Sequence, residues 1–154
     1  MKFCIVFPSG YFYEQKNYPT VYLLHGYNQT YKDWMENTEL LIYSVNYDFI
    51  IITPEGKNSW YSNSISRENS KYEDYIVKDL VRFINEKYRT IARKKSRAIV
   101  ELSMEGYGSA KLALKNDSLF FFVGCLSPAI HVPFGLADSS ILKRRSKESM
   151  QSIR

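Results

Sequence analysis

A serine stands at the junction between a strand-like and a helix-like stretch, and its type and position suit a nucleophile. The apolar run over residues 97–102 has the composition of a buried strand, and the helical pattern that follows begins at Ser103 with no intervening loop. A serine hydroxyl attacks a carbonyl when a base accepts its proton. The first backbone N–H groups of the following helix can bind the resulting oxyanion, which the helix dipole also favours. The alternative is that Ser103 only caps the helix.

Two glutamates flank this serine, where a catalytic strand–serine–helix turn usually has glycines in the order Gly-x-Ser-x-Gly. Glu101 and Glu105 occupy the two glycine positions. A carboxylate about 4–6 Å from a developing oxyanion would cost roughly a few kcal/mol of transition-state stabilisation. We expect Glu101 to point into the packing between strand and helix and Glu105 to point away along the helix. A Ser–Glu catalytic pair is therefore the weaker alternative.

The elements that would hold this junction are apolar runs alternating with amphipathic stretches. Strands are expected over residues 2–7, 20–25, 48–53, 97–102 and 119–126. Helices are expected over residues 31–47, 72–88 and 103–114, the first with Trp34, Leu40, Leu41 and Val45 on one side. Continuous apolar runs suit strands that are buried on both faces of a parallel sheet. The alternation predicts an α/β fold with right-handed crossovers.

Composition indicates one domain with a basic end. The chain has 154 residues, 45% of them hydrophobic, and a net charge of +5. Most of this charge comes from the last sixteen residues, but no aromatic residue or nucleic-acid motif accompanies it, so we expect neither nucleic-acid nor membrane binding. Cys4 and Cys125 lack metal-ligand spacing, and no run reaches the ~18 apolar residues of a membrane span. We expect a cytoplasmic protein with no cofactor and no metal.

Several segments together resemble the esterase D, S-formylglutathione hydrolase and tributyrin esterase group of α/β-hydrolases. They are residues 18–27 with Asp33-Trp34, 52–61, 72–80, 97–108 with 111–114, and Leu126-Ser127. The resemblance implies a serine carboxylesterase or thioesterase that acts on a small ester or thioester. It places Ser103 at the nucleophile position and the backbone N–H groups of Tyr27 and Met104 in the oxyanion hole.

The resemblance also implies roles around these groups. His25 and Gly26 are expected beside the substrate, with His25 shaping the loop through hydrogen bonds to nearby backbone rather than acting as the base. Asn28-Gln29 replaces the glycine-rich turn expected after them, which would move the oxyanion loop. Trp60 and Tyr61 either line the substrate pocket or pack in the core.

The acid and the histidine of a catalytic triad are not identified in this sequence. The family orders its triad as serine, acid, histidine. After Ser103 the only histidine is His131 and the only aspartates are Asp117 and Asp138, and none matches the family's motifs. We therefore expect a truncated hydrolase domain over residues 1–130 that lacks the last strands, an irregular basic tail over 131–154, and little or no turnover.

Two other functions remain open. The chain could be a non-catalytic binding or interaction module of the same fold, or a half-enzyme completed in trans by a separate chain. The unpaired sheet edge that missing strands would leave predicts self-association.

Overall fold

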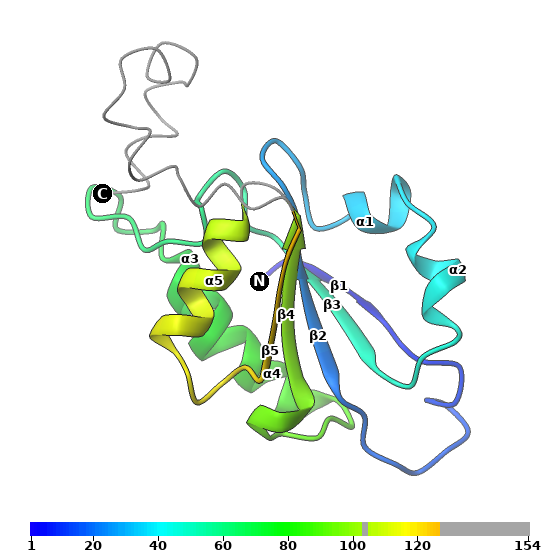
Figure 1. Ribbon diagram of the computed structural model, residues 1–154. Coiled ribbons are helices and arrows are strands. Elements are labelled where there is room, and N and C mark those ends of the chain that lie inside the picture. Colours follow the sequence, from blue (N-terminus) through cyan, green and yellow to red (C-terminus); the bar gives the residue numbers. More distant parts are fainter. Residues whose placement is uncertain (103–104, 127–154) are drawn as a thin grey trace.

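A five-stranded sheet forms the centre of the protein. The structure is a computed structural model that describes residues 1–102 and 105–126. The strand order is β1-β3-β2-β4-β5 (Figure 1). The strands are β1 Phe3–Val6, β2 Thr20–Leu24, β3 Ile50–Pro54, β4 Arg97–Leu102 and β5 Phe122–Leu126. β1 is antiparallel to β3 and all other neighbours are parallel, which confirms the predicted α/β fold with a mostly parallel sheet.

Helices lie on both sides of this sheet (Figure 1). On one side, α3 Tyr72–Asp74, the π-helical η1 Tyr75–Leu80 and α4 Val81–Lys87 form a continuous helical stretch, and α5 Glu105–Lys115 lies beside it. On the other side are the short helices α1 Asp33–Glu36 and α2 Leu40–Ser44. The short 3-10 helix η2 Lys94–Ser96 leads into β4. The helix predicted over residues 72–88 is confirmed, with π-helical turns in its middle.

The main core lies between the sheet and the helices α4 and α5. Its fully buried side chains alternate along the strands and recur at helical spacing in the helices: Tyr22, Leu24, Ile50, Ile52, Ile76, Leu80, Ile84, Ile99 and Leu112. Strand residues two apart share one face of a sheet, and helix residues four apart share one side of a helix. This packing therefore fixes α5 against β4, which are the two elements that flank the serine junction.

The helix predicted over residues 31–47 is instead two short helices. The Thr38 hydroxyl donates to the Trp34 carbonyl between them, a side-chain bond that competes with continued helical hydrogen bonding. Trp34 is anchored to the sheet because its indole N–H donates to the Leu24 carbonyl at 2.9 Å. Leu41 and Val45, predicted on the same side as Trp34, are exposed instead. The prediction failed because the interruption ends the helical register that would have aligned them.

β5 is shorter and more exposed than predicted. It begins at Phe122 rather than at residue 119, and Phe120 is buried in the core just before it. Phe122 and Leu126 are both largely exposed, so this strand is not buried on both faces. The reason is its place in the sheet, since within the described residues β5 pairs only with β4.

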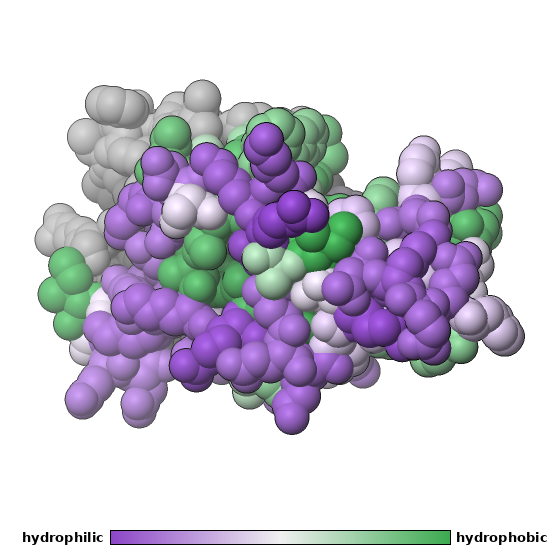
Figure 2. All heavy atoms as spheres, turned by 90° about the horizontal axis from the view of Figure 1, so that it is seen from below, coloured by the Kyte–Doolittle hydropathy of each residue, from purple (hydrophilic) through white to green (hydrophobic). Residues whose placement is uncertain are grey.

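The lower end of the molecule, as drawn in Figure 1, has a mainly hydrophilic surface. Figure 2 views this end and shows polar residues around smaller apolar areas. The loop after β2 and the end of β4, which the serine prediction concerns, lie at the opposite end of the sheet. In the described part of the chain, no helix is both long and apolar enough to cross a membrane.

Two leucines of α5 test this packing because they differ in burial. Leu112 is 0% exposed and Leu114 is 83% exposed. We expect Leu112→Ala to lower the free energy of unfolding by about 2–5 kcal/mol, because it leaves a cavity in the core. Leu114→Ala should change it by no more than about 0.5 kcal/mol. Urea unfolding followed by circular dichroism measures both, and equal losses would contradict the described orientation of α5.

Candidate active site

The serine junction lies between the end of β4 and the start of α5. Ser103 and Met104 themselves, like the predicted tail over 131–154, lie outside the described residues. β4 pairs in parallel with β2 as far as the last residue of β2, which is opposite Glu101. Ligands of parallel α/β sheets bind beyond the carboxyl ends of the strands. The loop that starts at His25 therefore leaves the sheet beside the junction.

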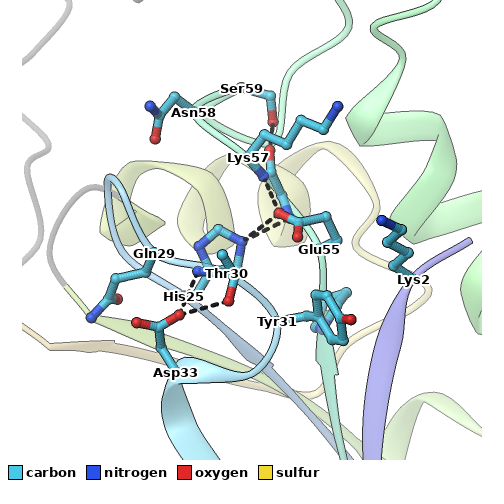
Figure 3. A network of polar contacts seen from close by, with 12 residues as sticks. Lys2, His25, Gln29, Thr30, Tyr31, Asp33, Glu55, Lys57, Asn58 and Ser59 are labelled. Carbon is cyan, nitrogen blue, oxygen red and sulfur yellow. Dashed lines mark hydrogen bonds and ion pairs between the residues drawn. The ribbon is translucent and has the colours of Figure 1, made fainter. Parts of the chain in front are cut away.

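His25 connects the loops that follow β2 and β3. Its side chain is fully buried, Nε2 accepts the Gly56 backbone N–H at 2.8 Å, and Nδ1 lies 3.0 Å from the Gly26 carbonyl. A ring nitrogen that accepts an N–H carries no proton, so the geometry assigns the neutral Nδ1–H form, which donates to Gly26. The Glu55 carboxylate lies 3.4 Å from Nε2 and accepts the Lys57 N–H at 2.8 Å (Figure 3). These are the backbone hydrogen bonds expected of His25, and they leave neither nitrogen available as a base.

The turn that contains Tyr27 is closed by side chains. The Gln29 side-chain oxygen accepts the Gly26 N–H at 2.6 Å, and the Gln29 N–H donates to the Gly26 carbonyl at 3.1 Å. Asn28 has a φ of 59°, a left-handed conformation that asparagine tolerates, and its N–H donates to the Asn58 side chain at 2.8 Å. The residues from Gly26 to Gln29 thus form a tight turn with asparagine, rather than glycine, at the left-handed position. No hydrogen bond of the Tyr27 backbone N–H is found among the described residues, and its place in an oxyanion hole stays a prediction.

Trp60 and Tyr61 form a buried turn beside α5. Their φ angles are 55° and 45°, left-handed values that cost about 1–3 kcal/mol for each non-glycine residue. The Ser59 hydroxyl accepts the Tyr61 N–H at 3.1 Å and donates to the Gly56 carbonyl at 2.6 Å. A Cβ on Gly56 would lie 2.3 Å from the Tyr61 ring, and one on Gly108 would lie 3.3 Å from it. Tyr61 therefore packs in the core, and a pocket-lining role for Trp60 stays a prediction.

Glu101 is buried between β4 and α5, on the side that the sequence predicted. One carboxyl oxygen accepts the Ser109 backbone N–H at 3.1 Å, and the other has no hydrogen-bond partner among the described residues. Burial raises the pKa of Glu101 to about 8, against the opposing effect of the helix N–H groups. The carboxyl group is therefore mainly neutral at pH 7. The electrostatic penalty predicted for a charged Glu101 is therefore reduced at pH 7, and the penalty predicted for Glu105, whose side chain lies outside the described part of the chain, stays a prediction.

Sequence reasoning missed three residues that hold the site together. Gly56 could have been found as a turn residue, since glycine and proline close together after an apolar run mark a turn or loop. Asn58 and Ser109 give no local signal, because their partners are 30 and 8 residues away in the sequence. No cluster of three His, Cys, Asp or Glu side chains in the described part of the chain could hold a metal ion.

A mostly parallel sheet with helices on both sides, in which the loop after β2 leaves the sheet beside the junction of β4 and α5, is typical of the α/β-hydrolase type. A family model described as "Putative esterase" matches residues 1–151. The chain therefore belongs to this esterase family.

Relatives with esterase names match most of this chain. The acetyl esterase of Caldicellulosiruptor saccharolyticus is 28% identical over 117 residues, which are 76% of this chain and 44% of that protein. An esterase of Mycobacterium tuberculosis is 30% identical over 118 residues, which are 72% of this chain and 25% of that protein. The chain thus spans less than half the length of these two relatives.

Solved structures share the fold. The fluorophosphonate-binding serine hydrolase F of Staphylococcus aureus has a TM-score of 0.79 at 24% identity, over 88% of this chain and 54% of that one. An S-formylglutathione hydrolase from Agrobacterium tumefaciens has a TM-score of 0.72 at 19% identity, over 96% of this chain and 63% of that one. Together with the family model, they support the resemblance to the esterase D and S-formylglutathione hydrolase group.

The buried carboxyl of Glu101 predicts a pH-dependent stability. Below its ordinary pKa of 4.5 the group is protonated in both folded and unfolded chains. Between that pH and about 8 only the unfolded chain ionises, so the free energy of unfolding falls as pH rises, by up to about 1.4 kcal/mol per pH unit. Glu101→Gln should remove this slope, whereas Glu86→Gln, at an exposed carboxylate, should keep it. Urea unfolding between about pH 5 and pH 8 tests this, and parallel curves for Glu101→Gln and the parent chain would refute it.

Proposed function

We propose that this chain binds the carbonyl of a small ester or thioester at the carboxyl ends of β2 and β4. In this proposal Ser103 is the nucleophile, and the backbone N–H groups of Tyr27 and Met104 bind the oxyanion. The parallel pairing of β2 with β4 carries the proposal, because it brings the Tyr27 loop to the strand end that precedes Ser103. Membership of an esterase family supports it. Backbone donors also survive changes of side chain, such as the glutamate at position 101.

The groups beside these donors complete the proposed binding site. His25 and Gly26 fix the backbone from which the Tyr27 N–H projects, and Trp60 and Tyr61 support the loop after β3. The name of the acetyl esterase relative suggests a short acyl group as the first substrate to try. The proposed chemistry uses only protein groups, with no cofactor. Both cysteines are free thiols, in keeping with the proposed cytoplasmic location.

We propose that turnover by these 154 residues alone is low, because a proton acceptor for Ser103 is not identified. His25 uses both ring nitrogens in backbone hydrogen bonds. Glu101 is mainly protonated at pH 7 and bonds to α5 instead. His131, the one histidine after Ser103 in the sequence, does not match the family's base. Serine hydrolases without their triad keep about 10³–10⁴-fold catalysis over water through oxyanion binding and substrate binding.

Fluorophosphonate labelling tests the proposed nucleophile, and hydrolysis of 4-nitrophenyl acetate tests the missing base. Mass spectrometry after treatment with a fluorophosphonate should find the adduct on Ser103. It should be absent in Ser103→Ala and unchanged in Ser118→Ala, which removes an exposed hydroxyl beyond α5. We expect slow release of nitrophenol, about 10³–10⁴-fold above the reaction in water, in the parent chain and in Ser103→Ala alike, because this residual rate comes from oxyanion and substrate binding. An adduct elsewhere would refute the nucleophile, and rapid turnover that Ser103→Ala abolishes would refute the missing base.

We also propose that β5 is an association edge. Its outer side chains Phe122 and Leu126 are largely exposed, and it pairs with only one strand in the described residues. An unpaired apolar strand edge offers backbone groups to another strand. Two copies of this chain can pair there. A separate chain that supplies the acid and histidine could pair at the same edge, which is the form that a half-enzyme completed in trans would take.

Sedimentation velocity distinguishes a free β5 edge from an associated one. We expect the parent chain to form dimers or larger species as its concentration rises. Phe122→Lys should shift the distribution toward monomer, because the lysine would bring two like charges together at a paired edge. Ile65→Lys changes an exposed residue far from β5 and should leave the distribution unaltered. A parent chain that stays monomeric at all concentrations would contradict self-association.

A further inference from the structure

Lys111 joins the helix that follows Ser103 to the buried turn at Trp60 and Tyr61. Its ammonium group donates to the Tyr61 carbonyl at 2.9 Å and to the Ser62 hydroxyl at 2.5 Å. The Ser62 hydroxyl in turn donates to the Trp60 carbonyl at 3.2 Å. One side chain of α5 thus contacts the backbone of the turn directly and through a single hydroxyl.

We propose that Lys111 is a positioning residue, which holds the Trp60–Tyr61 turn and the oxyanion loop at a fixed position relative to the nucleophile helix. The positioning itself concerns the folded chain, and its effect on reactivity rests on the proposed esterase function.

The turn needs such a restraint because two adjacent aromatic residues have positive φ angles. Aromatic side chains disfavour this conformation, so surrounding contacts must maintain it. The Ser59 hydroxyl restrains the turn from the side of β3. Lys111 restrains it from the side of α5, where its hydrogen bonds to the turn add to the packing of the Tyr61 ring beside Gly108.

Lys111 is itself held in place by a buried carboxylate. The Glu73 side chain on α3 is only 12% exposed and lies 3.7 Å from the Lys111 ammonium and 2.7 Å from that of Lys115. Burial lowers the pKa of Lys111 to about 8, while Glu73 acts in the opposite direction. The ammonium therefore remains mostly charged at pH 7. Its contacts bring α3, α5 and the Trp60–Tyr61 turn together at one ion cluster.

The restraint reaches the oxyanion loop through three further contacts. The Tyr61 ring lies where a Cβ of Gly56 would be, so a shift of the ring changes the space at Gly56. The Gly56 N–H donates to His25 Nε2, and His25 contacts the Gly26 carbonyl. Gly26 precedes Tyr27, whose N–H is the proposed oxyanion donor. Movement of the turn would therefore move this donor relative to α5.

Fluorine NMR of protein labelled with 5-fluorotryptophan tests the positioning directly, because the chain has only Trp34 and Trp60. We expect Lys111→Met to shift or broaden the Trp60 signal and to leave the Trp34 signal unchanged. The Trp34→Phe variant assigns the two signals. Lys115→Met is the matched control, since Lys115 contacts Glu73 but makes no contact with the turn among the described residues, and it should leave both signals unchanged. An unchanged Trp60 signal in Lys111→Met would overturn the proposal.

Fluorophosphonate labelling of Ser103 provides the functional measurement. Displacement of the donor should slow labelling at least about tenfold in Lys111→Met and less than twofold in Lys115→Met. We expect Lys111→Met to fold, because it removes a partly buried charge and Glu73 still forms its ion pair with Lys115. If it does not, Lys111→Gln retains a donor and should give a smaller change of the Trp60 signal, and no change would overturn the proposal. If the parent chain is not labelled, the esterase proposal fails, and the NMR result still decides the role of Lys111.

Discussion

The side chain of His25 bridges two loops of the candidate site, and the geometry of both loops depends on this bridge. It accepts the Gly56 N–H after β3 and donates to the Gly26 carbonyl after β2. Both bonds are buried, where an unmade hydrogen bond would cost about 1–3 kcal/mol. Both ring nitrogens of His25 are thus used in backbone hydrogen bonds, which leaves neither available for proton transfer to a substrate.

A second layer of packing maintains the loop after β3. The Tyr61 ring occupies space beside Gly56 and Gly108 that side chains at those positions would fill. The Tyr61 ring packs the loop against α5, and the hydrogen bonds of Ser59 and Lys111 orient the loop. Two left-handed aromatic residues are tolerated because these contacts together offset their conformational cost.

Sequence patterns predicted the elements whose stability is local or continuous. The bounds of β4 match the apolar run at residues 97–102, and the helix expected over residues 72–88 contains the buried side chains of Ile76, Leu80 and Ile84. The helix at 31–47 failed because one threonine side chain, Thr38, redirects the hydrogen bonding between α1 and α2. The positive φ of Tyr61 could not be predicted, since aromatic residues rarely adopt it and its causes are distant contacts. The segments that resemble an esterase identified the site's loops, but not the protonation state of any residue in them.

Glu101 shows why position and charge must be considered separately. The glutamate in place of a glycine at this position predicted an electrostatic obstacle beside Ser103. In the folded chain the carboxyl group points between β4 and α5, bonds to the Ser109 N–H, and has its pKa raised to about 8. The Coulomb repulsion between Glu101 and an oxyanion is therefore reduced at pH 7. Burial of this carboxyl group lowers the free energy of unfolding as pH rises. What remains at this position is the packing of the Glu101 side chain between β4 and α5.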